Sequence, residues 1–352
     1  MKKKIVFKCI LFLCIFFVLF LGAQEILRYK WDSDLTVRMS EYEEEPEGTI
    51  DVVYFGSSPI YAGMNPMAMW NSYGITSFNF GISMQAALPE YYQVAYALTE
   101  HTPKVVVIDL CALTQERSAD DEAWEVSYRK VIDTMPDWRL KISAIKDVVQ
   151  DNEDQTWLSY LFPIVRYHDR WNELSREDFD EIARKSWYKD YLKGALMSKA
   201  VENLRLNEEE RREIENLQED DVTINEINAS YYDRIISLCK EKGINVVAVS
   251  LPKYDRTWSV QQSSMSKLYC TSRGIPFIEY MNDNKIQEVG LDLSTDFYNS
   301  GHLNVYGAEK ITKNLGGYLK EWYNLEDHRE DINYDSWNES YQQYMLEFYG
   351  GE

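Results

Sequence analysis

Five short runs rich in β-branched and aromatic residues are spaced along this chain, and they restrict its fold more than any other feature. They cover residues 49–56, 75–81, 103–110, 244–252 and 275–280. Helical patterns of apolar residues lie between or before them, at 89–101, 226–243, 260–274 and 304–323. Strands that alternate with helices form βα units around a mostly parallel sheet. We therefore predict an α/β fold.

The segments outside this alternation divide the chain further. Residues 112–225 are rich in Trp, Tyr, Arg and acids and carry few strand signals. This composition predicts a long helical insertion, of the kind that forms caps or substrate walls at the carboxyl edge of α/β sheets. Residues 327–352 carry apolar side chains at helical spacing, which predicts an amphipathic tail packed on the body. An acidic stalk at 25–50 precedes the main domain at 51–326.

The N-terminal segment predicts a membrane anchor, residues 1–24. Between Ile5 and Ala23 the only charge is Lys8, and this apolar run would be about 28 Å long as a helix, close to the ~30 Å hydrocarbon thickness. A cleaved signal peptide is the alternative, but Leu21 and Ala23 match its −3 and −1 positions poorly. Three lysines before the run place the N-terminus in the cytoplasm. The remaining chain would then lie outside, attached to the cell membrane by a single span.

Charge and composition exclude several function classes. The net charge is −21, from 37 basic and 58 acidic residues, so the overall field opposes binding to nucleic acid. The five cysteines are odd in number and widely spaced, with no C-x-x-C, and do not support a disulfide framework or a zinc site. The four histidines show no H-x-x-x-H spacing. We expect no catalytic metal.

A serine and a histidine at opposite ends of the main domain are candidate catalytic residues. Ser58, in "DVVYFGSSPIYAG", follows a predicted strand and a glycine, where the carboxyl ends of parallel strands place functional sites. His302 lies in "TDFYNSGHLNVYGAEKIT". A serine nucleophile needs such a base, and the base needs a group that orients its ring. The structural alternatives are a helix-capping serine and a polar loop histidine.

The two motifs together resemble those of the SGNH/GDSL hydrolase superfamily. The similarity is to its membrane-anchored, extracytoplasmic acyltransferase-like branch, which includes the DltD protein of teichoic-acid D-alanylation and the acetyltransferases of exopolysaccharide synthesis. It covers residues from about 51 to 319, with the insertion weakly matched. The resemblance implies a three-layer α/β/α sandwich with a flavodoxin-like sheet. It also implies Ser58 as nucleophile, His302 as base and no diffusible cofactor.

The chain departs from the family pattern at the residue that should orient the histidine. The family's D-x-x-H motif has Asn299 in the aspartate position. An asparagine can hold an imidazole tautomer, but it cannot stabilise an imidazolium with a full charge. Asp296 lies six residues before His302 and is the alternative source of that charge. The sequence leaves both open, together with an inactive site.

The second departure concerns the oxyanion donors. The family's G-x-N-D motif is missing after the third predicted strand. The Ser58 amide is then the first expected donor, with Asn79, the Gly81 amide and Gln85 of "FNFGISMQ" as further candidates. Gln85 is equally well explained as an ordinary residue at the start of a helix.

These residues predict serine-dependent acyl-ester chemistry, either O-acyl transfer or ester hydrolysis, on a cell-envelope or exopolysaccharide glycan. His168 and Arg170 of the insertion are candidate substrate-binding residues, although a structural hydrogen-bonding role is the simpler explanation for His168. Family analogy suggests a membrane-bound O-acyltransferase as partner. The alternative from another class is a non-catalytic envelope protein that keeps the fold as a binding or scaffolding module.

Overall fold

The computed structural model describes residues 2–30, 35–115, 118–152, 154–180, 188–202, 222–253 and 256–350. Its α-helices are α1 (Lys2–Leu27), α2 (Leu35–Glu44), α3 (Ser58–Gly63), α4 (Pro66–Tyr73), α5 (Ala87–Glu100), α6 (Glu122–Ile132), α7 (Trp138–Asp151), α8 (Trp157–Leu161), α9 (Ile164–Tyr167), α12 (Glu226–Glu241), α13 (Arg256–Arg273), α14 (Asp283–Val289), α15 (Val305–Tyr323) and α16 (Asp335–Tyr349). The short 3₁₀ helices are η1 (His168–Asn172), η2 (Arg176–Asp178), η3 (Asp190–Leu192) and η5 (Ile332–Tyr334).

The centre of the molecule is a five-stranded sheet in the order β2-β1-β3-β4-β5, in which every pair of neighbouring strands is parallel. The strands are β1 (Val52–Phe55), β2 (Ser77–Asn79), β3 (Val105–Asp109), β4 (Asn245–Ser250) and β5 (Phe277–Glu279). Each lies within one of the five predicted runs, so the predicted α/β fold is confirmed. A separate antiparallel pair joins β6 (Phe297–Asn299) to β7 (His302–Leu303).

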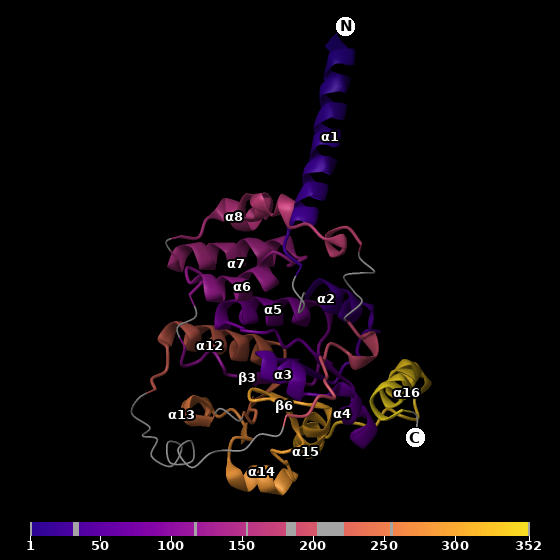
Figure 1. Cartoon of the computed structure of the whole chain (residues 1–352), viewed down its shortest axis with the longest axis vertical. Coiled ribbons are helices and arrows are strands. Elements are labelled where there is room, and N and C mark those ends of the chain that lie inside the picture. Colours follow the sequence, from indigo (N-terminus) through magenta and orange to yellow (C-terminus); the bar gives the residue numbers. More distant parts are fainter. Residues whose placement is uncertain are drawn as a thin grey trace.

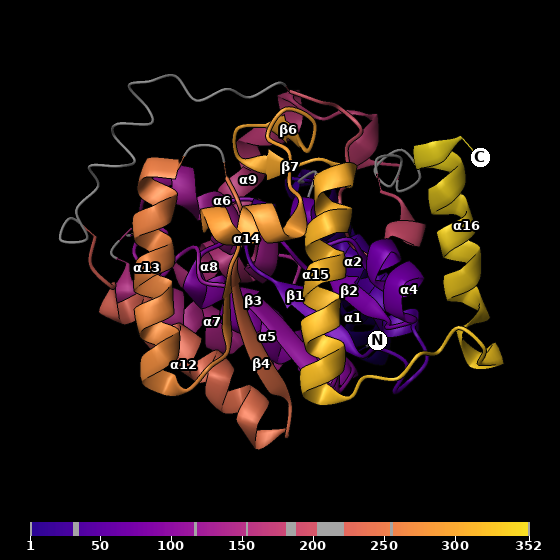
Figure 2. The same cartoon turned by 90° about the horizontal axis from the view of Figure 1, so that it is seen from below.

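Alternate side chains of the strands fill two apolar layers, one on each face of the sheet. Val53 and Phe55 of β1 belong to the larger layer, which contains residues of α5, α12, α6 and α7. Val52 and Tyr54 point to the opposite face and pack with residues of α3, α4 and α15. This alternation explains why the strand runs are apolar at nearly every position. Figures 1 and 2 show helices covering both faces, as in a three-layer α/β/α sandwich.

The strand order creates a point where functional groups gather. The chain leaves β1 toward β2 on one side and later enters β3 on the other side of β1. In doubly wound sheets, ligands bind outside the carboxyl ends of the two strands at such a reversal. Here those ends are the turn after Phe55 of β1 and Asp109 of β3.

The described part of the predicted insertion builds outward from one face of the sheet. Helices α6 and α7 pack against α5, and α8 packs against α7. In Figure 1 these helices are stacked between the sheet and the base of α1. Residues 188–202 return toward the carboxyl edge of the sheet, where the Leu196 amide donates to the Tyr61 carbonyl at 2.9 Å. Residues 203–221 of the predicted insertion lie outside the described residues.

Two terminal helices frame this body. Helix α1 projects away from it, as Figure 1 shows, and is the one helix of the described residues long and apolar enough to cross a membrane. Helix α16 lies along the body, with Trp337, Tyr344 and Phe348 buried. The Tyr344 hydroxyl meets the Asn65 side-chain amide at 2.9 Å, which links the tail to the start of α4.

Candidate active site

The turn after β1 brings two serines to the switch point of the sheet. Gly56 ends the strand with φ = +141°, a conformation that a side chain would strain. A Cβ at Gly56 would also lie 2.7 Å from Cγ of Asp109. The glycine therefore allows the β1 turn to approach β3 closely. Ser57 precedes α3 as its N-cap residue, and Ser58 is the first residue of the helix.

Asp109, at the end of β3, holds this turn in place. Its Oδ2 accepts hydrogen bonds from both the amide and the hydroxyl of Ser57, each at 3.1 Å. Its Oδ1 accepts the Cys111 amide at 2.8 Å. These bonds fix Ser57 and leave Ser58 as the serine whose hydroxyl makes no hydrogen bond with any residue in the described part of the chain. Sequence reasoning missed Asp109, although an acid ending the strongest strand was a visible signal.

The loop after β2 fixes the other side of α3. Asn79 donates through its side-chain amide to the carbonyl oxygens of Ile60 and Met64, at 2.9 and 2.8 Å. Its Oδ1 accepts the Gly81 amide at 2.9 Å. A Cβ at Gly81 would lie 2.5 Å from the Tyr61 backbone nitrogen, so the loop and α3 are in close contact.

Three of the predicted oxyanion donors already make hydrogen bonds within the fold. The Asn79 amide hydrogens and the Gly81 N–H are used within the fold, and here they hold α3. Gln85 is fully buried, where its amide donates to Gln93 Oε1 at 2.8 Å and its oxygen accepts the Ser127 hydroxyl at 3.1 Å. The oxyanion role of these three residues remains a prediction that requires the observed bonds to open. The Ser58 amide has no hydrogen-bond partner among the described residues.

The β6–β7 turn positions His302 through Asn299. The Asn299 Oδ1 lies 2.8 Å from His302 Nδ1 and also accepts the Gly301 amide at 2.9 Å. Asn299 therefore sets the imidazole tautomer, with hydrogen on Nδ1 and a lone pair on Nε2.

Asp296, the alternative partner for His302, is engaged elsewhere. Its Oδ2 lies 2.7 Å from the Lys310 ammonium and 2.6 Å from the Asp292 amide. The carboxylate is almost fully buried in these contacts. The expectation that Asp296 supplies charge to the imidazole is therefore not met in this structure, because Lys310 holds that charge.

Nε2 of His302 is the ring nitrogen that Asn299 does not contact. It is buried and has no hydrogen-bond partner in the described part of the protein. The ring lies parallel to those of Tyr298 and Tyr61, with ring centroids 5.3 Å and 6.1 Å away. Helix α3 packs against β7, and Ser58 and Tyr61 are three residues apart on α3, which places them on one helix face. Ser58 therefore lies one helical turn before the residue of α3 that stacks on His302, and no hydrogen bond joins Ser58 to His302 in the described part of the chain.

The surroundings of His302 keep its imidazole neutral. Burial, with a smaller contribution from the nearby Lys253 charge, lowers the pKa of His302 from 6.5 to about 4. At pH 7 the ring is therefore in the form that can accept a proton. A pKa this low also makes it a weak base.

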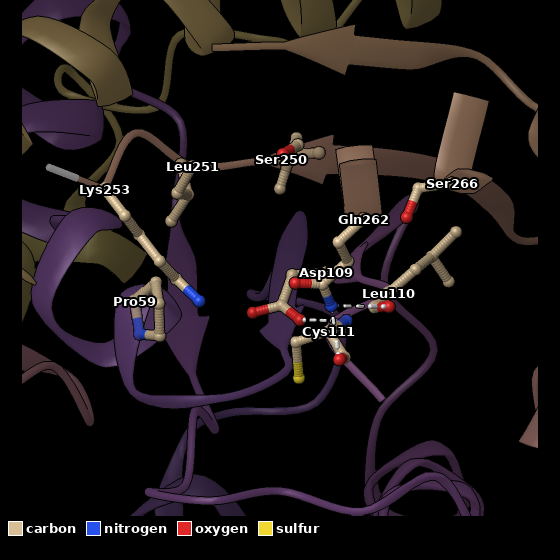
Figure 3. Close-up of a pocket in the computed structure, with 10 residues that line it drawn as sticks. Pro59, Asp109, Leu110, Cys111, Ser250, Leu251, Lys253, Gln262 and Ser266 are labelled. Carbon is tan, nitrogen blue, oxygen red and sulfur yellow. Dashed lines mark hydrogen bonds between the residues drawn. The ribbon is translucent and has the colours of Figure 1, made fainter. Parts of the chain in front are cut away.

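A small cavity of about 30 Å³ opens beside the serine turn. Its lining includes Pro59, Asp109, Lys253, Gln262 and Ser266. Figure 3 shows the Lys253 side chain extending past Pro59 toward Asp109. The Lys253 ammonium makes no hydrogen bond or ion pair with the residues described. The cavity therefore carries the positive charge of Lys253 on the side that faces Asp109.

The predicted substrate residues of the insertion lie elsewhere. His168 is exposed, and its Nδ1 lies 3.1 Å from the Val165 carbonyl oxygen. The Arg170 guanidinium donates to the Leu27 carbonyl at 2.7 Å, and pairs with Asp178 at 3.1 Å. These contacts place both residues at the base of α1 and not beside His302. Their role as substrate-binding residues stays a prediction, and the observed contacts of Arg170 join the insertion to α1.

Comparisons with known proteins leave the family of the chain open. No family model matches it, and no curated protein matches it. Among solved structures, one similar chain is described as a "putative acylhydrolase" from Bacteroides fragilis, with 12% identity, a TM-score of 0.38, and coverage of 82% of this chain and 97% of that one. A GDSL-like lipase from Bacteroides thetaiotaomicron has 11% identity, a TM-score of 0.37, and coverage of 83% and 98%. Likeness at this level leaves activity to be argued from the site itself.

Proposed function

We propose that this protein is an SGNH-type serine enzyme that carries out acyl-ester chemistry outside the cytoplasm while anchored to the membrane by α1. One observation carries the proposal: His302 has its Nδ1 fixed by Asn299 and a buried Nε2 without a hydrogen-bond partner among the described residues, and its ring stacks on Tyr61, one turn after Ser58 on α3. Most buried polar side-chain atoms have a hydrogen-bond partner, and His302 Nε2 has none among the described residues. A catalytic histidine base must leave one ring nitrogen available.

The proposed reaction proceeds through an acyl-enzyme. Ser58 Oγ attacks the ester carbonyl carbon as its proton passes to His302 Nε2. Collapse of the tetrahedral intermediate breaks the bond to the leaving alcohol, which takes the proton back from His302. The acyl group, now on Ser58, then passes to water or to a sugar hydroxyl by the same proton transfers in reverse.

Stabilisation of the oxyanion would begin with the Ser58 amide, since its N–H has no partner among the described residues and lies at the start of α3. Lys253 adds a positive charge near the reacting carbon. The Ser58 amide and the Lys253 ammonium stabilise an oxyanion most strongly in a site from which water is excluded.

The location of the site supports a glycan substrate. With the N-terminal lysines in the cytoplasm, the sheet lies outside the cell, among envelope polysaccharides. Tyr61 and Tyr298 flank His302 with aromatic rings of the kind that stack on sugars. We therefore propose an O-acylated cell-envelope or extracellular glycan as substrate or acceptor. A membrane-bound O-acyltransferase is the proposed source of acyl groups if the enzyme is a transferase.

The experiment uses the full chain in lipid nanodiscs and p-nitrophenyl acetate as the ester. Ser58→Ala and His302→Ala are expected to lower turnover to the level of nanodiscs without enzyme. Ser57→Ala, next to the proposed nucleophile, is the matched control and is expected to keep most of the wild-type turnover. Addition of a soluble acceptor glycan then separates acyl transfer from hydrolysis. Turnover that survives Ser58→Ala would reject the mechanism.

A non-catalytic scaffold remains the second candidate, and Asn299 is the observation that favours it. An asparagine at this position weakens a serine triad by about 10⁴ in turnover in the best-studied case. If wild type and Ser58→Ala show the same rate with soluble esters and with an acyl-donor partner, the scaffold function replaces the enzymatic one.

A further inference from the structure

Six exposed apolar side chains gather in the part of the insertion that contacts the base of α1. They are Trp157, Leu158, Leu161, Val165, Trp171 and Phe179, with exposed fractions between 38% and 71%. They lie on or beside α8, α9, η1 and η2, and we call this group the α8–η2 surface. Scattered exposed apolar residues are normal, but their concentration in one segment of the chain points to an interaction surface.

Contacts between this segment and α1 fix its position along the helix. Helix α1 touches α9, η1 and η2. The ring of Phe20 lies 5.7 Å from the ring of Phe162, edge to face. Nearer the C-terminal end of α1, Arg170 donates to the Leu27 carbonyl. The body of the protein is therefore held against the last turns of α1 and not suspended beyond them.

The depth of Phe20 then sets the depth of the surface. The apolar run of α1 ends at Ala23, so Phe20 lies about 4.5 Å inside that end at the helical rise per residue. If the run spans the hydrocarbon, Phe162 lies at the boundary between acyl chains and headgroups. Leu158, Leu161 and Val165 lie within about one turn of Phe162 in the chain.

We infer that the α8–η2 surface rests in the outer headgroup layer of the lipid bilayer and that the protein is held on the membrane by this surface as well as by α1. The two exposed tryptophans suit the interface, where Trp is enriched because its ring is apolar and its N–H is polar. Apolar faces of this kind enter the boundary by roughly 5–10 Å. The inference depends on α1 crossing the bilayer, as in the proposed function, but not on catalysis.

The test measures the depth of spin labels on the full chain in phosphatidylcholine nanodiscs. One label is placed at Leu158→Cys and a matched one at Leu346→Cys on α16, a leucine of similar exposure on a helix far from α1 in Figure 1. Cys9 and Cys14 are replaced by alanine in both variants. A third sample labels native Cys14, in the middle of the apolar run, to verify that α1 crosses the bilayer.

Collision rates with a polar nickel complex and with oxygen give the depth of each label. We expect the Leu158 label to collide with nickel about tenfold less often than the Leu346 label and more often with oxygen, because it lies in the lipid boundary. Equal nickel access at the two sites, with Cys14 buried in lipid, would overturn the inference and leave the anchor in place. Low access to both reagents at Leu158 would show a protein neighbour instead of lipid and would also overturn it. A Cys14 label exposed to water would show that α1 does not cross the bilayer and would also overturn the inference.

Turnover of p-nitrophenyl acetate is measured on the same labelled samples. The substituted leucines lie outside the proposed site, so turnover is expected to equal that of the unlabelled chain. Absent turnover with the expected label depths would count against the proposed chemistry and leave the membrane surface established.

Discussion

At the scale of single residues, the chemistry depends on what Asn299 does for His302. Asn299 orients the ring through one 2.8 Å contact, while burial and Lys253 lower the pKa of the imidazole. No carboxylate offsets these effects, since Asp296 is paired with Lys310. In the proposed mechanism His302 is therefore a weak base.

Asn299→Asp is expected to strengthen that base. The carboxylate keeps both acceptor contacts and adds a charge that stabilises the imidazolium, so the pKa of His302 rises from about 4. Turnover of p-nitrophenyl acetate should increase by about 10- to 1,000-fold, below the ~10⁴ known for the reverse change in a serine triad. Asn299→Ala, which removes the acceptor, should lower turnover. An unchanged rate in Asn299→Asp with normal thermal unfolding would show that His302 is not the base.

The fall of kcat/KM at acid pH, the acid limb of its pH profile, should report the protonation of His302. Because only neutral His302 accepts a proton, kcat/KM should be constant between about pH 6 and 8 and fall to half near pH 4. The unfolded chain binds a proton at this residue between its ordinary pKa of 6.5 and about 4, where the folded protein does not, so stability also falls as pH drops through that window.

Lys253→Met removes the smaller of the two causes of the low His302 pKa. The acid limb should move to higher pH but stay below 6.5, since burial, the larger cause, remains. The pH dependence of kcat/KM for wild type and variant measures the displacement. A limb that does not move would mean that another group titrates.

At the scale of elements, the site depends on how α3 is held between the β1 turn and the loop after β2. The resemblance to known motifs was enough to select Ser58, His302 and Asn299. Asp109 escaped prediction because its role depends on β1–β3 pairing, which brings it to Ser57 across 52 residues of sequence. The choice between Asn299 and Asp296 could not be made from spacing either, since both lie within six residues of His302. The structure decides it, because Asn299 at the end of β6 contacts the imidazole across the β6–β7 turn, whereas Asp296 contacts Lys310.

Asn79→Ala is expected to loosen α3. The change leaves the Met64 carbonyl oxygen without its donor and the Gly81 amide without its acceptor, whereas the Ile60 carbonyl keeps the Met64 amide. We expect a loss of about 2–6 kcal/mol in the free energy of unfolding, at roughly 1–3 kcal/mol for each unpaired group. Asn71→Ala, at an exposed position on α4, is the matched control and should change it by less than about 0.5 kcal/mol. Chemical denaturation of both variants measures the difference. Equal stability would contradict the assigned role of Asn79.

At the scale of the whole molecule, helices α6, α7 and α8 of the insertion separate the sheet from α1. The alternation of apolar runs predicted the sheet and its helices, because buried parallel strands need such runs. The sequence could not show that α6, α7 and α8 stack outward from α5 toward α1, since that depends on tertiary packing. The exposure of the α8–η2 surface could not be predicted for the same reason, because tertiary packing decides which tryptophans are buried.

This stacking predicts which esters the enzyme can reach. Two helix-to-helix spacings of about 8–10 Å and one sheet-to-helix spacing of about 10 Å put the sheet roughly 25–30 Å beyond α8. In nanodiscs, the full chain should hydrolyse p-nitrophenyl acetate but not a fluorogenic phospholipid whose ester lies in the bilayer. Comparable cleavage of the phospholipid would place the site at the membrane surface and contradict the stacking.

The most direct test of the central claim is to map the reactive serine. The full chain in nanodiscs is treated with a fluorophosphonate, which is expected to modify Ser58, and the labelled peptide is identified by mass spectrometry. We predict an adduct on Ser58 in the wild type and in Ser57→Ala, a much slower reaction in His302→Ala, and faster labelling in Asn299→Asp. An adduct on Ser57, or equal labelling of wild type and His302→Ala, would contradict the account of Ser58 as a nucleophile activated by His302.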